Sequence, residues 1–271
     1  MAFDDSDLDA IEQPPTPADV ARLKPWQLLW DCITGPVAAM GRLAEHPGWR
    51  RWVWPLGLLA LLNLGTFALQ TPMRGRLAGA LIQAQLAKAQ VQMGDAGAAG
   101  GAVMASGVTG GMNLVQTIFG VVGIPLGILL GTLLTAAILH FVGTVLGGQQ
   151  AFGQVFTVAA WAKTPLILGA VVKLAGAAAG NFDMSPAGLS GLVAQDPFGD
   201  DPAVGSYLGP LLGQIELWNL WYLALLAVAV LAVSRVSKGK ALGAVALLVG
   251  MRVLAGAAGV AIGNLVGNFG Q

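Results

Sequence analysis

The sequence predicts an all-α, polytopic membrane protein with five transmembrane helices and amphipathic interfacial helices at the N-terminus and in the first loop. Hydrophobic residues make up 55% of the 271 residues and charged residues only 10%, whereas charged residues form about a quarter of a typical soluble domain. Five apolar stretches approach or exceed the about 20 residues that a helix needs to cross a hydrocarbon core about 30 Å thick. Nearly all Lys and Arg residues lie outside these stretches, which cover residues 53–70, 118–146, 154–180, 217–234 and 241–263.

The chain begins with an acidic segment. Residues 1–18 contain Pro14, Pro15 and Pro17 and too little apolar surface to offset the entropy of ordering, so a disordered acidic tail is expected. The first nineteen residues contain no Lys or Arg, which argues against a cleaved signal peptide because such a peptide begins with a basic region.

Residues 19–52 are expected to form a cytoplasmic amphipathic interfacial helix. Apolar side chains recur at intervals of three and four over residues 25–46, and Asp31, Arg42 and Glu45 lie among them. A break is predicted at Gly35-Pro36, because the proline ring opposes an unbroken turn. The residues that follow are typical of interfacial anchors at the headgroup level: Trp49, Arg50, Arg51, Trp52 and Trp54.

The first loop and the second span follow. Residues 72–93 place apolar side chains at roughly helical spacing beside basic and amide side chains, which predicts a second interfacial helix. The glycine-rich residues 94–111 predict a flexible linker without secondary structure. As a single helix, the apolar residues 113–146 would exceed about 45 Å, so Pro125 is the candidate kink.

The rest of the membrane domain, which extends over residues 53–267, contains two predicted loops. Residues 147–153 form a short, uncharged loop, and residues 181–213 form an acidic loop without Lys or Arg. Asp196, Asp200 and Asp201 lack the regular alternation and the Glu of a calcium-binding loop, so a solvated acidic surface is expected there.

Lys and Arg residues between the spans predict the orientation, because their excess marks the cytoplasmic side. With the N-terminus in the cytoplasm, eight lie on the inner face and three on the outer face. The inner set is Arg22, Lys24, Arg42, Arg50, Arg51, Arg235, Lys238 and Lys240, and the outer set is Arg74, Arg76 and Lys88. The predicted location is a multi-pass protein of the cytoplasmic (inner) membrane, with the C-terminus on the opposite side.

Glycines repeat every four residues in three spans, where they let another backbone approach closely. Packing between helices of one chain is the expected use, and a homo-oligomer interface is the alternative. The rows are Gly123, Gly127 and Gly131; Gly176 and Gly180; and Gly259, Gly263 and Gly267.

Ionisable side chains inside the apolar stretches are few, since a charge buried in lipid costs at least about 2.5–3.5 kcal/mol. Lys173 and Glu216 are both expected near the outer boundary, where they can form an ion pair. His140, Lys163 and Arg252 lie in the inner half to the middle of their spans, with no acidic residue of a span at their depth. The hypothesis is that an anionic ligand, such as a lipid phosphate, completes a binding site formed by these three residues.

Structural explanations of the three basic residues stay open. Lys163 and Arg252 can reach the inner headgroups along their alkyl stems, His140 can be neutral, and Asp31 can fold in as a counter-ion. Pro165 favours a polar site close to Lys163, because a proline leaves a backbone carbonyl without its helical donor.

No catalytic residues are predicted. The chain contains no G-x-S-x-G elbow, no H-E-x-x-H and no P-loop, and neither His46 nor His140 lies beside a nucleophile and an acid in the sequence. Cys32 is the single cysteine, which leaves no disulfide within the chain and no Cys/His metal set. A protein without enzymatic activity, metal or cofactor is expected.

Three stretches carry a family resemblance. The first runs from Ile33-Thr34-Gly35-Pro36 through Met40-Gly41-Arg42-Leu43 and His46-Pro47-Gly48-Trp49 to Trp54-Pro55-Leu56. The second reads F-G-Q-V-F-T-V-A-A-W-A-K-T-P at residues 152–165, and the third joins I-E-L-W-N-L-W at 215–221 to S-K-G-K-A at 237–241. Together, over about residues 30–265, they resemble the Yip domain of prokaryotic members of the Yip family, the Ypt/Rab-interacting membrane proteins.

The resemblance implies a bundle of five transmembrane helices with a cytoplasmic N-terminus and the C-terminus across the membrane. Eukaryotic members of the family bind prenylated small GTPases and act in vesicle trafficking. Their D-L-Y-G-P-like element is matched here only by Asp31 and Gly35-Pro36, at an altered interval. This departure argues against small-GTPase binding.

The expected function is therefore that of a non-catalytic integral membrane protein of the Yip domain type, a membrane scaffold or a lipid-associated, trafficking-like factor. Membrane lipids are the expected partners and nucleic acid is not. The alternative is a small transporter or channel for an anionic or polar solute. A pore lined by polar atoms would favour transport, whereas a dry bundle with a lateral groove open to acyl chains would favour lipid association.

Overall fold

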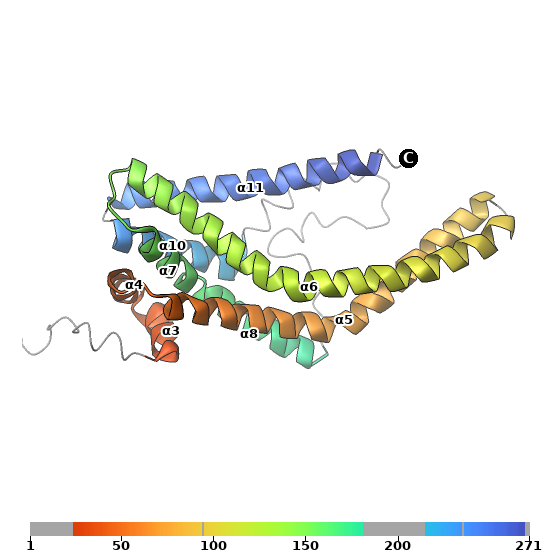
Figure 1. The fold of residues 1–271 in the computed structure, drawn as a ribbon, viewed down its shortest axis with the longest axis horizontal. Coiled ribbons are helices and arrows are strands. Elements are labelled where there is room, and N and C mark those ends of the chain that lie inside the picture. The colour runs from red at the N-terminus through yellow and green to blue at the C-terminus, as the bar shows by residue number, and fades with distance from the viewer. Residues whose placement is uncertain (1–23, 94, 181–214, 235, 269–271) are drawn as a thin grey trace, which may run out of the picture. The chain divides into compact units, whose positions relative to one another are not determined.

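The computed structural model describes residues 24–93, 95–180, 215–234 and 236–268. Every regular element within these ranges is a helix, which confirms the all-α class. The expected acidic tail at 1–18 and the whole of the expected acidic loop at 181–213 lie outside the described residues. The helices, labelled in Figure 1, are α3 (Pro25–Thr34), α4 (Pro36–Glu45), α5 (Trp49–Met93), α6 (Asp95–Val145), α7 (Phe152–Trp161), α8 (Thr164–Ala178), α10 (Leu217–Ser234) and α11 (Lys238–Asn268).

Five segments among the described residues are long and apolar enough to cross a membrane, as predicted. Each overlaps the apolar stretch predicted for it. The first begins earlier than expected, so the aromatic and basic cluster at 49–54 belongs to its first turns. The segments are Trp49–Met73, Thr117–Val145, Phe152–Ala178, Leu217–Ser234 and Lys238–Ala258.

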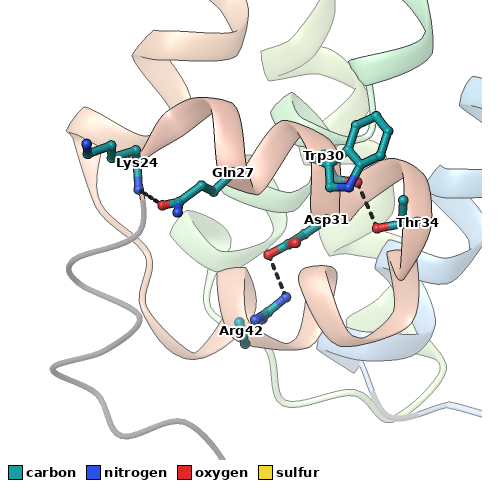
Figure 2. A network of polar contacts seen from close by, with 6 residues as sticks. All are labelled: Lys24, Gln27, Trp30, Asp31, Thr34 and Arg42. Carbon is teal, nitrogen blue, oxygen red and sulfur yellow. Dashed lines mark hydrogen bonds and ion pairs between the residues drawn. The ribbon is translucent and has the colours of Figure 1, made fainter.

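The segment before the first span forms two helices, as the predicted break at Gly35-Pro36 implied. Pro25 opens α3 and Pro36 opens α4, at a position where a missing N–H removes no helical hydrogen bond. Figure 2 shows Asp31 of α3 and Arg42 of α4 pointing toward one another, and Arg42 Nη2 lies 2.8 Å from Asp31 Oδ2. The ion pair joins the two helices across the break.

Two predictions about the first loop are wrong. Residues 72–93 are not a separate helix but the end of α5, which continues through Pro72. Residues 95–111, expected to be an irregular linker, are helical and form the start of α6. A helix already nucleated in a span gains one backbone hydrogen bond for each residue it adds, and the alanines of these segments favour that growth.

The third span differs from the others because it is broken and buried. Its two halves, α7 and α8, are separated by a turn at Ala162 and Lys163, where the sequence analysis expected one continuous stretch. Of its most apolar window 78% is buried, against 17% in the first span and 17% in the second. The third span is thus the most enclosed by protein, whereas the first and second expose apolar side chains that suit lipid contact.

The chain falls into two compact units. The first lies within Met1–Trp54, Thr135–Thr164 and Tyr222–Met251, and the second within Pro55–Leu134, Pro165–Trp221 and Arg252–Gln271. In the first unit α4 packs against both α3 and α7. Its fully buried side chains include Met40, Leu43, Trp161, Tyr222 and Leu226.

In the second unit, helices approach closely at glycines. A Cβ added to Gly169 would lie 2.8 Å from Cγ of Trp218, and one added to Gly65 would lie 3.2 Å from Cδ1 of Leu174. Gly120 faces the ring of Phe67 in the same way. Large side chains therefore fit against backbone at these positions.

Among the described residues, the row Gly123, Gly127 and Gly131 does not closely approach another helix of the chain. An added Cβ at any of the three would have no described atom within 4 Å. Gly180, from the second row, ends α8 with φ +78, a conformation that glycine adopts without strain. The side chains around Gly259, Gly263 and Gly267 lie outside the described set. Four-residue spacing shows that the glycines share one face of a helix. It does not show whether that face packs against a neighbouring helix.

Candidate functional site

Trp161 satisfies a backbone carbonyl that a proline leaves open in α5. Pro55 has no backbone N–H, so the carbonyl of Arg51, four residues earlier, lacks its helical donor. Trp161 Nε1 donates to that carbonyl at 3.1 Å. The indole is 1% exposed and stacks on Trp54, with ring centroids 6.2 Å apart. A buried indole N–H needs an acceptor, and α5 supplies one where its own ladder is interrupted.

The break in the third span repeats this arrangement. Pro165 leaves the carbonyl of Trp161 without its helical donor, and Thr164 Oγ1 donates to it at 2.7 Å. The Thr164 side chain is also the hydrogen-bond partner of Cys32 on α3. Burial raises the pKa of the Cys32 thiol to about 12, although the hydrogen bond with Thr164 acts in the opposite direction. The helix break is thus the point at which α3 attaches to the third span.

Lys163 lies in the turn of the same break, beside Pro165 as the sequence analysis anticipated. Its side chain is buried, and Nζ lies 5.1 Å from the ring centroid of Tyr222 on α10. An ammonium over an aromatic face offsets part of the cost of burying the charge. Tyr222, which is fully buried, is a neighbour that the sequence analysis did not identify.

His140 lies near the end of α6, beside the loop to α7. Its ring meets Phe152 edge to face, with centroids 5.8 Å apart. Its carbonyl accepts hydrogen bonds from Thr144 Oγ1 at 2.8 Å and from Gln150 Nε2 at 3.3 Å. Within the described residues, the buried His140 Nδ1 and Gln150 Oε1 have no hydrogen-bond partner.

The three basic residues predicted to share an anionic ligand have different surroundings. His140 contacts Phe152 and Gln150, and Lys163 contacts Tyr222. Both belong to the first unit, whereas Arg252 belongs to the second. A common site for the three therefore stays a prediction.

The cluster predicted to anchor the chain at the interface divides into two groups. Trp49 is 65% exposed, and the Arg50 guanidinium lies 5.4 Å from its ring centroid. Trp52 instead meets Phe156 of α7 edge to face at 5.1 Å, and Trp54 stacks on Trp161. Interfacial anchoring stays a prediction for all five residues, while Trp52 and Trp54 also hold α5 against α7.

Lys173 and Glu216, which were expected to pair, lie within ion-pair distance. Lys173 Nζ is 3.3 Å from Glu216 Oε1. The lysine side chain is 58% exposed, so the pair contributes little to stability. The position of this pair at the outer boundary of the membrane stays a prediction.

A cavity of about 440 Å³ lies in the first unit, where several helices end. The C-terminal residues of α4 and α10 and the turn after α6 supply most of its wall, and Gln154 contributes from the first turn of α7. The lining residues are Gly41, Ala44, Glu45, Gly147, Gln149, Gln154, Ala232, Val233 and Ser234.

Gln154 connects two of the helix ends at this cavity. Its Nε2 donates to the Ala44 carbonyl at the end of α4, and its Oε1 accepts from the Ala151 amide at the start of α7, both at 2.9 Å. The sequence analysis missed this residue. Its bond to the Ala151 amide is the one that the Glu or Gln of a capping box makes, but Ala151 stands where the sequence signal requires Ser or Thr.

A family model described as the Yip1 domain matches residues 30–260. The chain belongs to the Yip1 domain family. The match begins in α3 and includes all five candidate spans. A comparison with curated proteins and one with solved structures give no match. The Yip1 domain family is generally a non-enzymatic family of membrane proteins.

The stretches that carry the resemblance have defined structural roles in this Yip1 domain. Gly35-Pro36 separates α3 from α4, and Pro55 frees the carbonyl that Trp161 binds. The A-W-A-K-T-P segment contains both the break in the third span and the Thr164 hydroxyl that caps it. No group of three His, Cys, Asp or Glu side chains able to hold a metal ion occurs in the described part of this Yip1 domain.

Proposed function

We propose that this Yip1 domain protein is a non-catalytic scaffold of the cytoplasmic membrane that associates with lipid headgroups at the cytoplasmic ends of its spans. The observation that carries the proposal is the position of the cavity at span ends. Its lining includes Ser234, the last residue of the fourth span, and Gln154, in the first turn of the third. Span ends lie at the depth of the lipid headgroups.

The α3 helix supports the same proposal. Trp26 and Trp30, one helical turn apart, are 60% and 62% exposed, while Leu28 and Cys32 on the opposite face are buried against protein. An amphipathic helix that shows aromatic rings to its surroundings beside a first span is suited to the interface between headgroups and acyl chains. The helix would attach the scaffold to the inner leaflet surface.

The absence of catalysis is part of the proposal. A membrane enzyme built on His140 needs an acid and a nucleophile beside the imidazole. The described neighbours of His140 include the Gln150 amide, the Phe152 ring and the Thr144 hydroxyl, which donates to the His140 carbonyl and not to the ring. None of these three groups is an acid.

The proposed orientation places the N-terminus in the cytoplasm and the C-terminus across the membrane. In a Cys32→Ala background, the variants Phe3→Cys and Gln271→Cys each carry one thiol. A membrane-impermeant maleimide is expected to label position 3 only in inside-out vesicles and position 271 only in right-side-out vesicles. The reverse pattern would contradict the orientation.

Lipid association is tested by extracting the protein directly into native nanodiscs and identifying retained lipids by mass spectrometry. Retention of specific lipids above the composition of the surrounding membrane is expected. Loss of anionic lipid in Lys163→Met and Arg252→Met would support the anionic site of His140, Lys163 and Arg252. Unchanged lipid in both folded variants would end that part of the proposal.

One observation favours the second candidate, a small transporter or channel for an anionic or polar solute. Transporters commonly build their sites at broken helices, and the third span is broken beside the buried Lys163. Flux of anions such as chloride or phosphate into liposomes that contain the protein, abolished by Lys163→Met, would replace the scaffold proposal with this one.

A further inference from the structure

We infer that the cavity at the ends of α4, α6 and α10 binds the primary ammonium group of an aminophospholipid, such as phosphatidylethanolamine. The inference rests on the proposed lipid association and adds the chemical class of the headgroup. The cavity, at about 440 Å³, is of the size that proteins use for small-molecule ligands.

The electrostatics of the cavity favour a cation. A helix carries a partial negative charge at its C-terminus, where the last carbonyls lack helical donors. The lining includes Ala44 and Glu45 at the end of α4, Gly147 just after α6, and Ser234 at the end of α10. Three helix C-termini and Glu45 thus line one cavity, and the N-terminus of α7, which contributes Gln154, acts in the opposite direction.

The side chains already bound to these helix ends are hydrogen-bond donors, as the partial negative charge of a helix C-terminus requires. Gln154 Nε2 donates to the Ala44 carbonyl at 2.9 Å. Lys240 Nζ donates to the Leu146 carbonyl at 3.2 Å, next to the lining residue Gly147. The structure itself therefore places an ammonium group on one of the three helix ends.

The chemistry of the wall favours a primary over a quaternary ammonium. Quaternary ammonium groups, such as choline, bind in cages of aromatic rings, and no aromatic residue is among the described residues that line this cavity. The polar residues in the wall are Glu45, which is exposed, and Gln149, Gln154 and Ser234. These groups, with the helix carbonyls, accept hydrogen bonds, and a primary ammonium donates three.

A lipid headgroup fits this site better than a lysine side chain of a partner protein. The wall residues Gln154 and Ser234 belong to the ends of membrane spans, where headgroups are concentrated. Lys240 is exposed and lies next to the cavity, so its ammonium can meet the lipid phosphate while the cavity takes the amine. A zwitterionic headgroup matches both charges.

The test uses the full-length protein, delipidated in detergent and reconstituted with equal amounts of phosphatidylethanolamine, phosphatidylglycerol and phosphatidylcholine. Lipids that remain bound after extraction are counted by native mass spectrometry. Phosphatidylethanolamine is expected to be enriched over both other lipids, and Glu45→Gln is expected to lower this enrichment roughly tenfold, because it removes a charge-assisted hydrogen bond.

A second variant fills the cavity instead of changing its charge. A Cβ added to Gly41, in the cavity wall, meets no described atom within 4 Å, so Gly41→Leu is expected to fold and to exclude the headgroup. The matched controls are Gly243→Leu, at another open glycine, and Glu216→Gln, an acid outside the cavity wall. Both are expected to keep the wild-type enrichment, and the unfolding temperature of every variant is measured in the same detergent.

Four outcomes would overturn the inference. Equal retention of the three lipids would refute the amine site and leave lipid association intact, whereas retention of no lipid would refute both. Enrichment that survives Glu45→Gln and Gly41→Leu would place the amine elsewhere. Binding of a lysine-rich peptide to membranes without phosphatidylethanolamine, lost in Glu45→Gln, would assign the cavity to a protein partner.

Discussion

The indole N–H of Trp161 and the carbonyl oxygen of Arg51 lie 3.1 Å apart, although the two residues are 110 positions apart in the chain. Replacing Trp161 with Phe keeps an aromatic ring and removes the donor. Because Pro55 cannot supply the usual helical donor to the Arg51 carbonyl, Trp161→Phe is expected to destabilise the protein by about 1–3 kcal/mol. Thermal unfolding in detergent micelles measures the change.

The control for this prediction restores the missing donor within α5. Pro55→Ala gives the Arg51 carbonyl a backbone N–H at the usual position in the helix. Trp161→Phe should then cost less in the Pro55→Ala background than in the wild type. Equal costs in the two backgrounds would show that the cost does not depend on the missing helical donor, which would contradict the prediction.

The ion pair between Asp31 and Arg42 is expected to make a small contribution to stability. The two side chains are 29% and 26% exposed, so solvent screens the attraction. Asp31→Asn and Arg42→Gln should each cost about 0.5–1 kcal/mol, and the double variant should cost less than the two added together. Unfolding temperatures at low and high salt measure this coupling, and strictly additive costs would contradict it.

Cys32 is expected to be unreactive in the folded protein and to make stability depend on alkaline pH. Burial raises the pKa of its thiol from 9.0 to about 12, so between these values the unfolded chain loses the proton and the folded chain keeps it. The stability contributed by the neutral thiol is present below pH 9.0 and falls as pH rises toward about 12, by about 1.4 kcal/mol per pH unit.

Two measurements check the Cys32 prediction. Iodoacetamide at pH 8 should label Cys32 in SDS but not in the folded protein. Denaturation between pH 9 and pH 11 should show a decline that Cys32→Ala flattens. Rapid labelling of the folded protein, or an identical slope in Cys32→Ala, would contradict the expected burial of a neutral thiol.

Gly169 is expected to tolerate no larger residue. A Cβ there would lie 2.8 Å from Cγ of Trp218, close to the stem of its side chain. Gly169→Ala should destabilise the protein by about 1–3 kcal/mol through overpacking. The control Gly127→Ala places its Cβ where no described atom lies within 4 Å, so a neutral or slightly stabilising effect is expected, and thermal unfolding compares the two.

The spans and the interruption at Gly35-Pro36 were predictable because both depend on local sequence. A run of apolar residues long enough to cross the bilayer excludes other structures, and a glycine followed by proline opposes helix continuation. The same local reasoning failed at residues 95–111. There the glycines indicated a linker, but the alanines and a helix already formed in the adjoining span favour α6.

Contacts between distant segments were less predictable. The sequence placed Lys163 and Pro165 close together in the third span. It gave no sign that the Tyr222 ring lies against the Lys163 ammonium or that Thr164 contacts Cys32. Likewise, the four-residue glycine spacing pointed to Gly123 and Gly127, whereas close packing uses Gly120 and Gly169. Side-chain periodicity defines the faces of one helix, and the choice between faces depends on the shapes of the neighbouring helices.

The bonds from Gln154 to Ala44 and from Trp161 to Arg51 also bear on how the chain is made. In each pair the donor is translated 110 residues after its acceptor. While the ribosome is still delivering the first two spans to the translocon, neither donor exists, and the end of α4 and the Arg51 carbonyl must rely on water or lipid. Insertion of the third span then completes both bonds, so a nascent chain arrested before residue 154 should leave its N-terminal helices open to protease.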